Sequence, residues 1–184
     1  MEKGFGRFAA ITLGVLLVGV SVVVFRAYSP AGWVAFASPD GDFSILMPRQ
    51  PEIQDDEAVS ETGKSPTPIH WATAEGDTST FICMYWDLAY TPEDDTDAQV
   101  AMAGNRDSLI NKFGGQLLSH EESQSRGYSE ERYKATTTDN GILEGRSFII
   151  GRRLYALSVA YPAEESNENA QKFLNSFKRV SKPD

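Results

Sequence analysis

The chain has 184 residues, of which 26 are acidic and 17 basic, giving a formal net charge of −9. This balance argues against a nucleic-acid-binding protein, because neutralising phosphates requires a basic surface. A single cysteine, Cys83, excludes an internal disulfide. With only two histidines, His70 and His120, there is little room for a zinc site or a catalytic triad, and we expect no cofactor.

The first element in chain order is an uncharged apolar stretch, Phe8–Phe25. As a helix it would span about 27 Å, close to the hydrocarbon core of a bilayer. Lys3 and Arg7 precede this stretch and Arg26 follows it. We therefore expect one transmembrane helix, with residues 1–7 in the cytoplasm and the C-terminal part periplasmic or extracellular.

A cleaved signal peptide is the alternative for this segment. Lys3 and Arg7 would form its charged region, and Ala35-Phe36-Ala37 has the small residues of a cleavage site. The apolar run is, however, longer than the usual span of about 7–15 residues. The retained anchor is favoured, with residues 26–32 as a short tether to a domain at residues 33–184.

Alternating hydrophobicity predicts two β-hairpins in the first half of this domain. Trp33–Ser38 and Phe43–Met47 flank an Asp-Gly turn, and Ile69–Glu75 and Thr80–Leu88 flank a Gly-Asp turn. Thr80–Leu88 is apolar on both faces, which predicts a central strand covered by two layers. We expect the acidic segment Glu52–Thr67 to be an exposed loop.

A helix and an antiparallel meander are predicted next. Thr96 or Asp97 can cap a helix that ends at Phe113, before two glycines. Period-two patterns then predict four strands, at Leu117–Glu122, Tyr128–Thr138, Ile142–Ile150 and Arg153–Tyr161.

The last predicted element is a helix over Ala163–Val180. It has one apolar face, and Lys178 and Arg179 lie at its C-terminal end, as the helix dipole favours. The apolar face comprises Ala170, Phe173, Leu174 and Phe177.

The densest group of oxygen ligands is a candidate metal site, formed by Glu93, Asp94, Asp95 and Asp97. Calcium takes such ligands. The group lacks the glycine and distal glutamate of an EF-hand loop, and acidic residues at a helix N-terminus are also explained by the helix dipole. Helix capping is favoured, and a cation is the alternative.

Arg152 and Arg153 are the candidate binding residues for a partner. They are adjacent positive charges at a predicted turn. The part of the chain after Arg26 has 14 basic and 25 acidic side chains, a formal charge of −11. These arginines could meet an acidic group on a partner, and an ordinary solvated turn is the alternative.

Three segments together resemble the PsbP-like domain superfamily: FASPDGDFSILMP at residues 36–48, GRRLYALSV at 151–159 and FLNSF at 173–177. The likeness covers residues 33–180 in order and spacing. It implies an α+β fold, with an antiparallel sheet and helices on both faces in an α/β/α sandwich. It also implies a role in binding or assembly. The membrane anchor departs from the cleaved signals of the photosynthetic members.

We expect a membrane-anchored, extracytoplasmic binding or assembly module that is not an enzyme. Its partners would be the membrane, through Phe8–Phe25, and a protein of the membrane or envelope. The alternative is a small-ligand or cation-binding domain of the same fold. A pocket with aromatic walls and a few convergent polar groups would favour this alternative.

Overall fold

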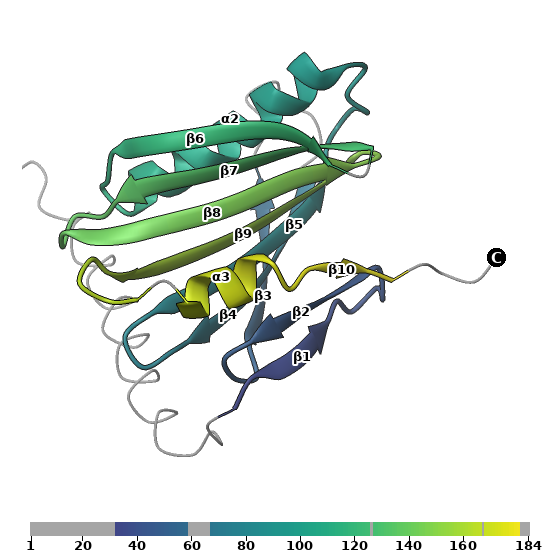
Figure 1. Cartoon of the computed structure of the whole chain (residues 1–184). Coiled ribbons are helices and arrows are strands. Elements are labelled where there is room, and N and C mark those ends of the chain that lie inside the picture. Colours follow the sequence, from purple (N-terminus) through teal and green to yellow (C-terminus); the bar gives the residue numbers. More distant parts are fainter. Residues whose placement is uncertain (1–31, 59–66, 126, 167, 181–184) are drawn as a thin grey trace, which may run out of the picture. The chain divides into compact units, whose positions relative to one another are not determined.

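The computed structural model describes residues 32–58, 67–125, 127–166 and 168–180 (Figure 1). Within these ranges, the structure has ten strands in two antiparallel sheets, and two helices. The predicted transmembrane helix at Phe8–Phe25 lies outside the described residues. Neither of the described helices combines the length and the apolar character needed to cross a bilayer.

The larger sheet has seven strands in the order β3-β4-β5-β9-β8-β7-β6. All neighbours are antiparallel, so the predicted meander is confirmed, with strand ends shifted by a few residues. The strands are β3 (Glu52–Ala58), β4 (Thr67–Glu75), β5 (Thr80–Asp87), β6 (Leu117–Ser125), β7 (Tyr128–Thr136), β8 (Gly141–Ile150) and β9 (Arg153–Pro162).

The smaller sheet contains the first predicted hairpin. β1 (Val34–Ala37) pairs with β2 (Phe43–Met47), and the short β10 (Lys178–Arg179) pairs with the other edge of β2. Ser38 stabilises the hairpin turn, because its hydroxyl accepts hydrogen bonds from the backbone N–H groups of Asp42 at 3.0 Å and Phe43 at 3.2 Å. The prediction of a hairpin here is confirmed.

Strand β5 is the central strand that the sequence predicts. It lies between β4 and β9, and its alternate residues enter two separate cores. Phe81, Cys83 and Tyr85 pack in the core beneath α3 (Glu168–Leu174) and the smaller sheet. Ile82 and Met84 pack in the core beneath α2 (Asp95–Lys112). The sheet is therefore covered on both faces.

The predicted loop at Glu52–Thr67 is wrong for residues 52–58, which form strand β3, and for Thr67, which begins β4. Residues 59–66 lie outside the described residues. Strand β3 pairs along its length with β4 at the edge of the sheet, where its charged side chains stay exposed. Backbone pairing outweighs the polar composition, and charges on an edge strand also hinder pairing with other chains.

The predicted helix at Ala163–Val180 is much shorter than expected, because α3 ends at Leu174. The Leu174 carbonyl accepts a hydrogen bond from Arg146 Nη1 at 3.0 Å. The Ser176 hydroxyl accepts one from the backbone N–H of Leu46 at 2.9 Å, which draws the chain into the smaller sheet. Lys178 and Arg179 therefore lie in β10 and do not complement the helix dipole.

Two successive buried glutamates on β7 attach the two covering layers to the sheet. Glu131 pairs with Arg106 of α2 on one face. On the other face Glu130 accepts two hydrogen bonds from Arg146, at 2.8 and 2.9 Å, and one from Arg132 at 3.0 Å. Because Arg146 also binds the Leu174 carbonyl, Glu130 fixes the end of α3 to the sheet.

We predict that Glu130 contributes to acid denaturation. Burial alone would raise the pKa of Glu130, but Arg146 and Arg132 outweigh burial and hold this pKa below its ordinary value of 4.5. The stabilisation is therefore present above pH 4.5 and is lost as the pH falls through the folded-state pKa. In urea unfolding between pH 7 and pH 3, Glu130→Gln should lose less stability than wild type. Equal losses would contradict this assignment.

The two-sided burial of β5 gives a second prediction. Phe81 is 2% exposed, so Phe81→Ala should lower the free energy of unfolding by about 3–5 kcal/mol through lost burial and cavity formation. Val100 is 65% exposed on α2, and Val100→Ala should change stability by less than about 0.5 kcal/mol. Urea unfolding measures both, and a loss below about 1 kcal/mol for Phe81→Ala would mean that this face is loosely packed.

Candidate functional site

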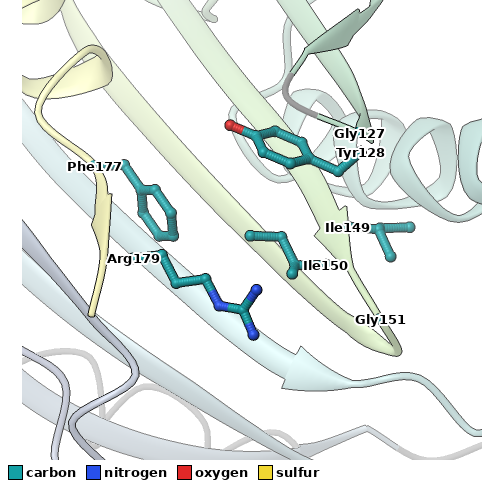
Figure 2. A pocket seen from close by; sticks show the side chains of 7 residues that line it. All are labelled: Gly127, Tyr128, Ile149, Ile150, Gly151, Phe177 and Arg179. Atoms are coloured by element: carbon teal, nitrogen blue, oxygen red, sulfur yellow. The ribbon is translucent and has the colours of Figure 1, made fainter. Parts of the chain in front are cut away.

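A cleft lies at one end of the larger sheet, where β8 turns into β9 (Figure 2). Its volume is about 340 Å³, at the lower end of the range for ligand sites. We refer to it as the β8–β9 cleft. Its lining consists of Gly127, Tyr128, Ile149, Ile150, Gly151, Phe177 and Arg179.

Three bulky side chains line the cleft beside polar groups, and the core holds them in place. Figure 2 shows Tyr128 from β7, Ile150 from β8 and Phe177 from the segment before β10 around one opening. All three are half-buried against the core beneath α3. The Phe177 ring lies 4.3 Å from the Phe148 ring centroid, and the Tyr128 ring lies 5.5 Å from it. This shared contact holds the opposite walls in place, so the cleft is preformed.

Arg179 supplies a positive charge at the rim of the cleft. It is exposed, and its position on β10 is fixed by pairing with Phe43 and by the hydrogen bond from the Val180 N–H to the Asp42 carbonyl at 2.9 Å. Figure 2 shows its guanidinium beside Ile150. Within the described residues, this guanidinium has neither an ion pair nor a hydrogen bond.

The two arginines proposed from the sequence have different environments. Arg152 follows Gly151 in the turn beside the cleft and is exposed, and its charge helps to lower the pKa of Asp87 without a hydrogen bond to it. Arg153 instead forms ion pairs with three carboxylates of the same chain. Its guanidinium donates to Asp87 at 2.8 Å and to Asp42 at 2.7 Å, and it also pairs with Asp40. Arg153 therefore joins β9 to β5 and to the β1–β2 turn.

These ion pairs also shift the pKa values of Asp87 and Arg153. The hydrogen bond from Arg153 holds the pKa of Asp87 below its ordinary value, and the hydrogen bond to Asp87 is the main reason that the pKa of Arg153 is raised. Both groups therefore remain charged under ordinary conditions. A partner would have to compete with three carboxylates for Arg153, whereas Arg152 is available.

The acidic cluster lies at the start of α2, where its side chains bind the backbone and a neighbouring strand. Asp94 is the N-cap and accepts from the Asp97 N–H at 3.0 Å, so the predicted cap at Thr96 or Asp97 is wrong. Asp97 accepts from the Glu93 N–H at 3.3 Å, and Asp95 accepts from Ser129 at 2.8 Å. Across the described part of the chain, no three metal-ligating side chains converge.

Groups suited to catalysis are held in structural contacts. Cys83 is fully buried, and burial raises the pKa of its thiol. His70 stacks on Tyr85 at 4.7 Å, and its Nδ1 lies 2.7 Å from Asp55. His120 lies 3.9 Å from Glu122 at the surface. None of these groups lines the β8–β9 cleft.

A second depression, of about 680 Å³, is larger but chemically less suited to a ligand. It is rich in threonines, and each of their hydroxyls already has a partner in the chain. Thr78 and Thr80 donate to Glu165 and Glu75, Thr138 donates to the Phe113 carbonyl, and Thr137 accepts from the Gly141 N–H. The β8–β9 cleft is therefore the stronger candidate.

The sequence predicts the turn beside the cleft but not the side chains that line it. Arg152 is correctly placed beside a turn, whereas Phe177 and Arg179 were assigned to a helix. The missed signal is Asn175-Ser176, because these side chains compete with the helix for backbone hydrogen bonds. Tyr128 was assigned to a strand, but its position beside Phe177 depends on tertiary packing.

Comparisons with known proteins establish a likeness in fold. No family model matches the chain, and no curated protein matches it. Among solved structures, it is similar to the solution structure of cyanobacterial PsbP (CyanoP) from Synechocystis sp. PCC 6803, with a TM-score of 0.55. The match covers 84% of this chain and 96% of the other at 11% identity, so it establishes a shared fold and nothing further.

The different environments of Arg152 and Arg153 give a third prediction. Arg153→Gln removes one cation from three carboxylates and should lower the free energy of unfolding by about 1–3 kcal/mol. Arg152→Gln should change it by less than about 0.5 kcal/mol, because the side chain is exposed. Urea unfolding of both variants at pH 7 provides the measurement. Similar losses for the two would contradict the assigned roles.

Proposed function

We propose that this chain, whose described domain has a PsbP-like fold, is a membrane-anchored binding or assembly module without enzymatic activity. The module is an α/β/α sandwich preceded by a transmembrane helix at Phe8–Phe25, and it works in the periplasm or outside the cell. The observation that carries the proposal is the β8–β9 cleft, a preformed recess lined by Tyr128, Ile150 and Phe177, with an arginine at its rim that has no ion pair among the described residues.

The chemistry of the cleft supports binding more than catalysis. Its bulky lining side chains are Tyr128, Ile150 and Phe177, and Arg179 has no neighbouring nucleophile or general base among the lining residues. Aromatic side chains and arginine are enriched at the centres of protein interfaces. A partner can therefore bury an apolar group against Ile150 and Phe177 and place negative charge at Arg179.

The anchor supports an assembly role through local concentration. An uncharged stretch of this length with Lys3, Arg7 and Arg26 at its ends is typical of a retained transmembrane helix. The tether at residues 26–32 is short, so the domain would search only the layer next to the membrane. Partners in the same membrane would then bind at a high effective concentration.

The location gives a fourth prediction. The full-length protein should stay in the membrane fraction after washing with high salt and carbonate. Protease added to the outside of intact cells should digest the domain while sparing an N-terminal tag. Immunoblotting with tags at each end provides the measurement. Release of a soluble product that begins near Ser38 would support the cleaved signal peptide and contradict the anchor.

The contact surface gives a fifth prediction. A photo-crosslinking residue at Arg152, beside the cleft, should join the chain to a discrete partner in intact cells. The same residue at Val100, which is 65% exposed on α2, serves as the control and should not. Ile150→Trp, which fills the cleft, should abolish the product without unfolding the domain. If Arg152 crosslinks equally well with Ile150→Trp, the cleft is not the contact surface.

A further inference from the structure

We infer that the β8–β9 cleft binds the C-terminal residue of a partner protein, with its apolar side chain in the recess and its free carboxylate at Arg179. This inference rests on the proposed binding function and names the group that the site recognises. It follows from the charge at the rim, the size of the recess and the free edge of β10.

The positive charge of Arg179 is unusual for this domain because most of the described arginines form ion pairs. The structure describes seven arginines, and four of them pair with carboxylates: Arg106, Arg132, Arg146 and Arg153. Arg179 and Arg152 belong to the minority without an ion pair, and Arg179 lines the cleft while Arg152 follows the lining residue Gly151. Within the described residues Arg179 forms no ion pair, and Arg152 interacts with Asp87 through its charge without a hydrogen bond. The site therefore favours an anion from outside the chain.

The recess fits one apolar side chain. At about 340 Å³ it is small, and its three apolar walls, Tyr128, Ile150 and Phe177, are fixed by the core. Figure 2 shows the Tyr128 ring across the opening from Arg179, with its hydroxyl directed away from the guanidinium. A ligand must therefore carry its apolar group and its negative charge within a single residue.

The third feature is the free edge of β10. In the smaller sheet β10 is an outer strand, with β2 on one side and the cleft on the other (Figure 2). An extended peptide can pair with such an edge through its backbone. A chain end in this position would place its last side chain beside Phe177 and its carboxylate beside Arg179. Guanidinium groups bind carboxylates through two parallel hydrogen bonds.

The test compares two peptides that differ only in their last group. Gly-Ser-Gly-Ala ending in 4-fluorophenylalanine is prepared with a free carboxylate or as the amide. Binding to the full-length chain in phosphatidylcholine nanodiscs is followed by ¹⁹F line broadening. The free acid should bind about tenfold more tightly than the amide, as expected for hydrogen bonds to a charged group. A small acid, 3-(4-fluorophenyl)propionate, should bind more weakly than the peptide acid because it cannot pair with β10.

Two variants assign the preference to the rim. Arg179→Gln should reduce the affinity of the acid to that of the amide. Lys178→Gln removes an exposed cation from the same strand but outside the lining, and it should leave the tenfold preference intact. Both side chains are exposed, and thermal melting should show that both variants remain folded.

Several results would overturn the inference. Equal affinity for acid and amide, or no binding of either at millimolar concentration, would reject recognition of a carboxylate. Equal affinity for an amidated peptide with an internal aspartate after the aromatic residue would reject recognition of the chain end. If the propionate binds as tightly as the peptide acid, the site is for a small molecule. The crosslinking experiment at Arg152 is independent of these results, and it tests whether a protein contacts the cleft.

Discussion

The interaction on which the β8–β9 cleft depends is the buried pair between Glu130 and Arg146. The two side chains form parallel hydrogen bonds at 2.8 and 2.9 Å, and Arg146 donates a third to the last carbonyl of α3. An unpaired charge at this depth would be costly, so the pair and the helix end are stable only together. The sheet thereby determines where α3 stops.

That stopping point positions the cleft. Beyond Leu174, Ser176 binds the backbone of β2 and Val180 binds Asp42, so the chain becomes extended within two residues of the helix. Phe177 then falls between the smaller sheet and β8, where it contacts Phe43 at 5.4 Å and Phe148 at 4.3 Å. If the helix continued, the side chains of Phe177 and Arg179 would point to different sides of it and could not line one cleft.

The sequence predicts those parts of the fold in which local pattern and tertiary environment agree. Strand β2 alternates buried and half-buried residues, β5 has apolar residues on both faces, and turn residues separate the strands of the meander from β6 to β9. Strand β3 was missed because an exposed edge strand has no apolar face and depends on backbone pairing with β4. The cleft was missed because it brings together Tyr128, Ile150 and Phe177 through long-range contacts. The difference in environment between Arg152 and Arg153 likewise depends on long-range contacts of Arg153 with Asp87 and the β1–β2 turn.

Different residues of the cleft contribute to folding stability and to the charge at its rim. Phe177 is both a wall of the cleft and a member of the aromatic core, so replacing it would lose packing and binding together. Arg179 and Arg152 contribute little to folding, because they are exposed and form no ion pair within the described residues. Substitution at these two positions can therefore change the charge that the site accepts while the apolar recess remains intact. In the binding role proposed above, a preformed recess with a replaceable charged rim would let the partner change while the fold is retained.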